Sequence, residues 1–169
     1  MTPSLVPLKQ WYCDTCGEVI QKPEHGYVEW KRDPQPGKRH RAAFRIVHHA
    51  LHSPYRQQGN DCYYSRSSRG GDIDLPHFLG ADGLVALSAW IDVGEEKEPD
   101  YRGPSVGDLR EWTVLLRRLQ VPYYEEARQY LPRAIRDSFG EANEVAFYMP
   151  ATLKSIIEHY REEDADSSD

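Results

Sequence analysis

The residues best suited to chemistry in this chain are its three cysteines and seven histidines. Two of the cysteines form the motif Cys13-Asp14-Thr15-Cys16-Gly17. A separation of two residues lets both thiolates bind one tetrahedral ion, and the glycine permits the turn with positive φ that such a knuckle commonly needs. The motif therefore predicts a metal-binding knuckle.

The same spacing also occurs in thioredoxin-like redox motifs, where the cysteine pair opens a helix within a βαβ unit. Here the pair lies between two short strand-like segments, Trp11–Tyr12 and residues 18–20, and no helical pattern follows it. This context favours Zn²⁺ binding over redox chemistry.

A tetrahedral structural site needs two further ligands, and Cys62 is the only other cysteine, so the natural completion is a Cys₃His site. Among the histidines, the pair His48-His49 is best placed because it ends a predicted strand. Strand alternation puts His48 on one face with Phe44 and Ile46, the face expected to cover the knuckle. We prefer His48, and His49 stays open as the alternative. The predicted ligands are Cys13, Cys16, His48 and Cys62. The competing interpretation is a free, buried Cys62 beside an ordinary strand-end histidine.

The elements that must position these ligands change character along the chain. Residues 26–31 and 43–48 are typical of strands and predict a hairpin, whereas residues 52–71 are predicted to be mostly loop. From residue 73 the apolar period becomes about 3.6. Helices are expected from about Asp82 to Gly94, around residues 109–119 with Ser105 or Asp108 as N-cap, over 123–131 with a kink or new helix at Pro132, and around 153–160.

With 169 residues and 11% aromatic content, the chain is expected to form one cooperative unit and not to be disordered. We predict an α+β fold in which a zinc-bound β-hairpin module, residues 1–72, packs on a helical bundle, residues 73–161. A disordered acidic tail, residues 162–169, is expected to follow.

Charge is distributed unevenly. Residues 1–72 carry 11 Lys/Arg and 7 Asp/Glu, a net charge of +4, whereas residues 73–169 carry 10 and 20, a net charge of −10. This asymmetry indicates either a face that binds a polyanion such as nucleic acid or two halves that attract each other, and both interpretations stay open. The basic residues between positions 31 and 69 are Lys31, Arg32, Lys38, Arg39, Arg41, Arg45, Arg56, Arg66 and Arg69.

The Cys-x-x-Cys-Gly knuckle, the predicted hairpin and the second ligand pair resemble the treble-clef and zinc-ribbon groups over roughly residues 11–64. The chain also resembles small uncharacterised bacterial proteins that pair such a knuckle with a Phe-x-Ile-x-His strand and a helical C-terminal part. This resemblance implies zinc at Cys13, Cys16, His48 and Cys62, and it implies no activity. In those groups the last two ligands usually lie two residues apart, whereas a long loop separates His48 from Cys62.

A nuclease is the alternative from a different class. His48-His49, Asn60 and Cys62 superficially resemble the HNH nucleases, in which a strand-end histidine activates water, an asparagine orients the loop and a helix supplies another metal ligand. The segment after Cys62 has neither a closing cysteine nor a helical pattern. No nucleophile elbow, Walker loop, dinucleotide fingerprint or His-Glu-x-x-His helix occurs.

The expected function is therefore a non-enzymatic, zinc-stabilised binding or regulatory module that contacts a macromolecule. A protein partner is expected first, and nucleic acid is possible through residues 31–69. The sequence has no 18-residue apolar run and no signal-peptide core in residues 1–10. We therefore expect no membrane contact and a cytoplasmic location.

Overall fold

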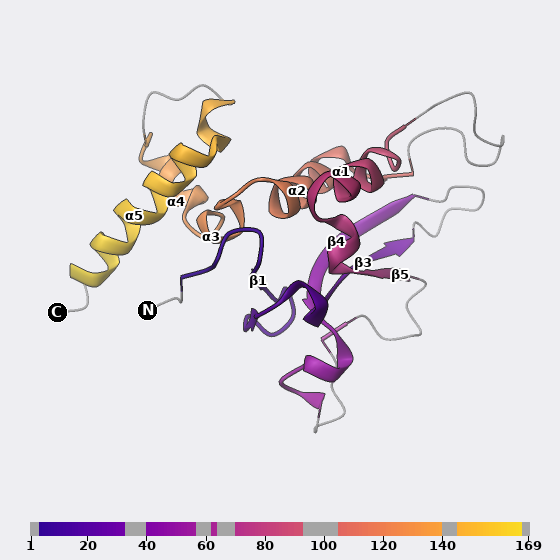
Figure 1. Cartoon of the computed structure of the whole chain (residues 1–169). Helices are drawn as coiled ribbons and strands as arrows, with labels where there is room; N and C mark the ends of the chain where they lie inside the picture. Colours follow the sequence, from indigo (N-terminus) through magenta and orange to yellow (C-terminus); the bar gives the residue numbers. More distant parts are fainter. Residues whose placement is uncertain are drawn as a thin grey trace.

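The computed structural model describes residues 4–32, 40–56, 62–63, 70–92, 105–139 and 145–166. Strands occupy the first part of the chain and helices the second, so the expected α+β class is confirmed (Figure 1). The strands are β1 (Trp11–Tyr12), β2 (Val19–Ile20), β3 (Gly26–Arg32), β4 (Arg41–His48) and β5 (Gly70–Asp74). The α-helices are α1 (Gly80–Ser88), α2 (Leu109–Gln120), α3 (Tyr124–Ala127), α4 (Leu131–Arg136) and α5 (Pro150–Asp166).

The central sheet has the order β4-β3-β5, and both pairings are antiparallel. The predicted hairpin is the β3–β4 pair, in which Gly26 lies opposite His48. Strand β5 falls partly within the segment that we expected to be loop, because its sequence Gly-Gly-Asp-Ile-Asp is poor in strand-forming residues. Gly71 is needed there because a Cβ atom would lie 2.7 Å from the Trp30 ring. Tertiary packing thus overrides weak local propensity.

The helices follow the sequence pattern with shifted boundaries. Asp108 caps α2, since its carboxylate accepts hydrogen bonds from Arg110 N at 2.7 Å and Glu111 N at 3.2 Å. The helix expected over residues 123–131 is shorter in the structure, where α3 spans Tyr124–Ala127. Pro132 lies in the first turn of the separate helix α4. Helix α5 continues to Asp166, into the segment that we expected to be a disordered tail.

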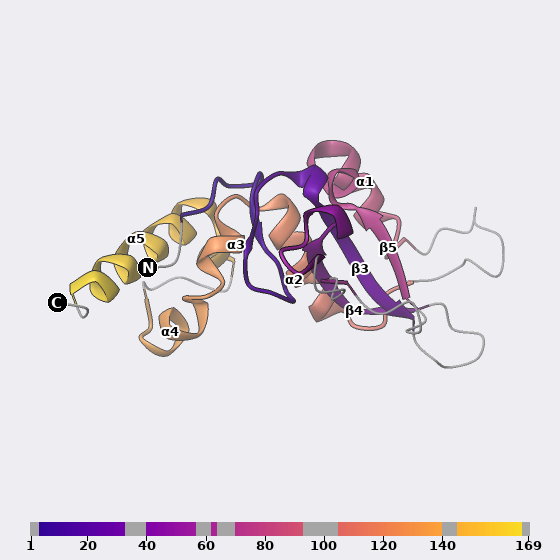
Figure 2. The same cartoon turned by 90° about the horizontal axis from the view of Figure 1, so that it is seen from below.

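Two buried clusters hold these elements together. The first joins the strands β1 to β4 to the segment after β5 and to helices α1 and α2. Its members include Trp11, Ile20, Val28, Ile46, Leu75, Leu87, Trp112 and Leu119. The second is formed by α3, α4 and α5, and includes Tyr124, Ala127, Leu153, Ile156 and Tyr160. Figure 2 shows α4 and α5 at the end of the molecule away from the sheet, with α2, α3 and the N-terminal segment between them. The predicted bundle is therefore divided, with α1 and α2 on the sheet's cluster and α3–α5 in their own.

No helix within the described ranges has the length and apolar character needed to cross a bilayer.

Candidate metal centre

Four side chains from three separate segments meet at one point. Cys13 and Cys16 come from the turn between β1 and β2, His48 ends β4, and Cys62 follows the short 3-10 helix η2 (Ala50–His52). Their ligand atoms all lie within 4.8 Å of one another. The sequence therefore predicted which residues come together, including the long-loop partner Cys62.

The spacing of the ligand atoms suits a tetrahedral ion. Nδ1 of His48 lies 3.5 Å from Sγ of Cys16 and 3.9 Å from Sγ of Cys62. Zinc–sulfur bonds of about 2.3 Å and zinc–nitrogen bonds of about 2.0 Å at tetrahedral angles give a sulfur–nitrogen separation of about 3.5 Å. All three cysteines are free thiols, and only Cys16 is not fully buried. The residues thus fit a closed metal centre.

The knuckle is built by backbone hydrogen bonds around the two cysteines. Gly17 adopts φ 78°, and its N–H donates to Cys13 O at 2.9 Å, while Cys13 N donates to Glu18 O at 2.9 Å. The adjoining strands pair Trp11 with Ile20. The positive φ is the reason for glycine at this position.

Strand β4 carries the knuckle on the edge that faces away from β3. Asp14 N donates to Ile46 O at 2.8 Å, and Ile46 N donates to the Asp14 carboxylate at 2.7 Å. These two bonds attach the knuckle to Ile46, two residues before His48 in the same strand. The backbone N–H and C=O of Ile46 on this strand edge are therefore both hydrogen-bonded, next to the position that carries the metal ligand.

Cys62 is held by two hydroxyl groups. Sγ of Cys62 lies 3.2 Å from the buried Ser53 hydroxyl, and the Thr15 hydroxyl donates to Cys62 O. Thr15 belongs to the knuckle itself, so the third cysteine is tied to the first two through the protein.

Of the two neighbouring histidines, His48 belongs to the cluster. The His48 ring faces the thiols, whereas His49 Nδ1 accepts a hydrogen bond from Leu51 N at 3.2 Å and its ring lies 4.6 Å from the Tyr27 ring. Because that bond engages the Nδ1 lone pair, the proton of neutral His49 is on Nε2. Asn60, the other residue of the nuclease interpretation, lies outside the described residues.

Three crowded thiols have unequal proton affinities. Burial alone would raise the pKa of Cys13, but hydrogen bonds from His48 and the backbone of Cys16 and Thr15 outweigh it and lower that pKa to about 6. Burial and the adjacent Cys13 raise the pKa of Cys16 to about 12, and burial raises the pKa of Cys62. A single thiolate is therefore stable without a cation, and an ion bound by all three must displace the protons of the other two.

The basic residues of positions 31–69 are partly used inside the protein. The Arg45 guanidinium donates to the buried carboxylate of Glu29. The Arg41 guanidinium donates to the Ser105 hydroxyl and lies over the Trp90 ring, 4.6 Å from its centroid. Lys38, Arg39, Arg66 and Arg69 lie outside the described residues.

A buried ionic network next to the knuckle was not anticipated from the sequence. Arg118 of α2 is fully buried, with its Nη1 2.6 Å from Asp14 Oδ2 and its Nε 2.6 Å from Glu125 Oε2. Arg128 also reaches both acids, at 2.9 Å from Asp14 Oδ1 and 3.2 Å from Glu125 Oε1. Ion pairs therefore join the two halves, but they are formed by an acid of the basic half and arginines of the acidic half. The one feature of the sequence that could have indicated this network is Asp14, a charged residue between the two cysteines of the knuckle.

The fold and the cluster define an α+β protein with a Cys₃His group that could hold one metal ion. Comparison of the chain with protein-family models, with curated proteins and with solved structures found no match. The assignment of a function therefore rests on the site itself.

Proposed function

We propose that this protein is a zinc-stabilised, non-enzymatic binding or regulatory module. The observation that carries the proposal is the convergence of the Cys13, Cys16, His48 and Cys62 ligand atoms within 4.8 Å of one another. Three thiolates and an imidazole form a set that binds zinc tightly, and four protein ligands leave no position for a substrate. A closed site of this kind stabilises a fold and does not activate water.

The expected role of zinc is to strengthen the contacts between segments that are far apart in the sequence. Of the segment that separates η2 from β5, the structure describes residues 53–56 and 62–63, and Cys62 lies within it. Because the ligands come from far apart in the sequence, the free energy of metal binding contributes directly to the free energy of folding. Residues presented near the site would then contact a macromolecule, with a protein as the first candidate and nucleic acid as the second.

The proposal is tested by zinc content in a matched pair of variants. Purified wild-type protein should contain about one equivalent of zinc by elemental analysis, as one Cys₃His set requires. His48→Ala should lose the metal, whereas His49→Ala should retain it, because only His48 faces the thiols.

Two results would count against this proposal. Wild-type protein that takes up no zinc after exposure to the ion under reducing conditions would remove the metal centre. Metal-dependent cleavage of DNA or RNA that His49→Ala abolishes while the melting temperature is unchanged would replace the binding module with the nuclease alternative.

A further inference from the structure

Asp14 occupies an unusual position, since it lies between two metal ligands and also contacts the helical part. Its Oδ2 accepts from Ile46 N at 2.7 Å and lies 2.6 Å from Arg118 Nη1, and its Oδ1 lies 2.9 Å from Arg128 Nη2. Its side chain is 16% exposed. One carboxylate thus joins the knuckle, the edge of the sheet and the corner between α2 and α3.

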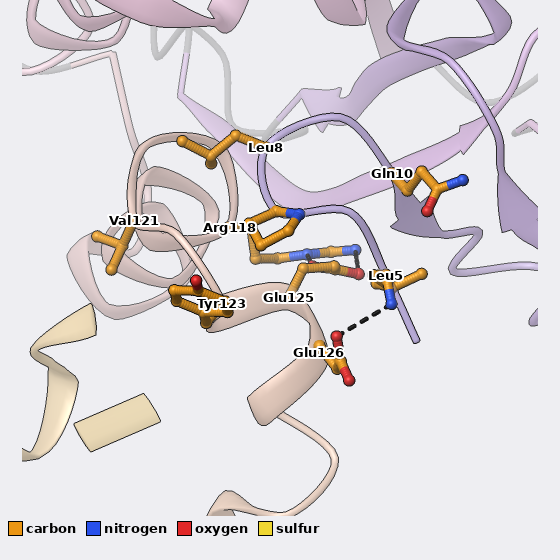
Figure 3. A pocket seen from close by; sticks show the side chains of 9 residues that line it. Leu5, Leu8, Gln10, Arg118, Val121, Tyr123, Glu125 and Glu126 are labelled. Atoms are coloured by element: carbon orange, nitrogen blue, oxygen red, sulfur yellow. Dashed lines mark hydrogen bonds and ion pairs between the residues drawn. The ribbon is translucent and has the colours of Figure 1, made fainter. Parts of the chain in front are cut away.

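The corner between α2 and α3 is organised around the same charges. Glu125 binds Arg118 through both oxygens, at 2.6 Å and 3.0 Å, and its Oε1 also accepts from Tyr12 N at 3.2 Å. Tyr12 is the residue before Cys13. In Figure 3, Arg118 and Glu125 lie side by side beneath the N-terminal segment. The hollow drawn there has space for no more than about one water molecule, so it is no ligand site.

The loss of any one partner from this network is costly. A buried guanidinium is tolerated only when its donors are paired, and the loss of one partner from such a group is strongly destabilising. Arg118 has two carboxylate partners, one on the helical side and one in the knuckle. A displaced knuckle would remove Asp14 from a buried arginine and weaken the attachment of the helices at the same moment.

Asp14 lies in the turn whose two cysteines would hold the ion. An ion bound by Cys13 and Cys16 fixes the positions of both cysteines, and hence the turn that carries the aspartate between them. We infer that Asp14 couples metal binding at the Cys₃His cluster to the attachment of the α2–α3 corner. The inference rests on the proposed function, and it makes the helical part a sensor of metal occupancy. By thermodynamic linkage, the attached helices raise the metal affinity by the same factor.

The experiment compares neighbouring acids of α3 that differ only in what they contact. Glu125 binds the two arginines of the network, whereas Glu126 accepts from Leu5 N at 3.0 Å and lies 2.7 Å from Arg161. Both are buried. Zinc affinity is measured by competition with a chromophoric chelator in full-length Asp14→Asn, Glu125→Gln and Glu126→Gln.

Asp14→Asn and Glu125→Gln should each weaken zinc binding by about 10- to 100-fold, the range for groups that orient metal ligands. Glu126→Gln should change it by less than about threefold, because Glu126 contacts neither Asp14 nor the two arginines of the network. The absorption spectrum of the cobalt(II)-substituted protein should remain that of a tetrahedral thiolate site in Glu125→Gln, because no ligand has been altered.

Equal zinc affinity in wild type, Asp14→Asn and Glu125→Gln would overturn the inference while leaving the metal centre intact. Equal losses in Glu125→Gln and Glu126→Gln would also overturn it, since they would reflect general destabilisation. Failure of the wild type to bind zinc would instead overturn the proposed function. Should Asp14→Asn not fold, Arg128→Gln replaces it, because Arg128 contacts the same two acids from a side chain that is 33% exposed.

Discussion

At the scale of single residues, the metal ligands were predictable because their chemistry restricts the choice. Three cysteines and a strand-end histidine leave few ways to complete a tetrahedral site, and the structure brings all four together. Asp14 was not predictable as a partner of Arg118, since that contact joins residues 104 positions apart. No local pattern records a pairing of that kind.

The unequal pKa values of the thiols predict a steep dependence of metal affinity on pH. Between about pH 7 and 8.5, Cys13 with its pKa of about 6 is ionised, whereas Cys16 with a pKa of about 12 and Cys62 with a raised pKa keep their protons. Zinc binding must then release about two thiol protons, so its affinity should rise about 100-fold for each unit of pH increase.

Isothermal titration of zinc in buffers of different ionisation enthalpy measures this proton release. Cys62→Ser, where it still binds zinc, should release about one proton fewer, because a serine hydroxyl has no accessible proton to lose. A wild-type affinity that does not change over this pH range would mean that Cys16 and Cys62 are not bound as thiolates.

At the scale of elements, sequence reasoning succeeded where the periodic pattern was strong and capped. Helix α2 has a regular apolar stripe and the N-cap Asp108, and it was placed almost to the residue. Strand β5 was not predicted, because it forms by pairing with β3 and its own sequence has little strand propensity. The break between α2 and α3 includes Tyr123, which has a φ of 69° although it is not glycine.

Helix α2 provides a direct test of its cap. Asp108→Ala should lower the free energy of unfolding by about 1 kcal/mol, because two backbone N–H groups lose their acceptor. Asp108→Asn is the matched control, as asparagine caps about equally well. Chemical denaturation at neutral pH compares the two, and an equal loss in both would mean that the aspartate's charge and not its cap geometry is important.

Strand β5 yields a second prediction. Gly71→Ala should destabilise the protein by about 1–3 kcal/mol, since the new methyl group would lie 2.7 Å from the buried Trp30 ring. Asp72→Ala, at an exposed position of the same strand, should have an effect below about 0.5 kcal/mol. Thermal unfolding distinguishes them, and an unaltered melting temperature in Gly71→Ala would place β5 away from Trp30.

At the scale of the whole molecule, the net charges of the two halves did not predict how they meet. Ion pairs join the halves between Asp14 of the basic half and two arginines of the acidic half, the buried Arg118 and the partly exposed Arg128. Two of the arginines counted in the basic segment, Arg41 and Arg45, contact Trp90 and Glu29. A charge count locates neither of these interactions, because it contains no information on burial.

These internal contacts predict how charge changes affect the intact protein. Arg45→Gln should lower the free energy of unfolding by about 1–3 kcal/mol, since it removes charged hydrogen bonds from the buried Glu29. The exposed Arg32 and Arg56 are the matched positions, and Arg32→Gln with Arg56→Gln should leave the melting temperature within about 2 °C.

We expect no gel shift of single-stranded nucleic acid by full-length wild-type protein at physiological salt. A shift that weakens steeply with added salt and is lost in the Arg32→Gln, Arg56→Gln protein would instead make nucleic acid the partner, because such a salt dependence arises from counterion release at phosphate contacts.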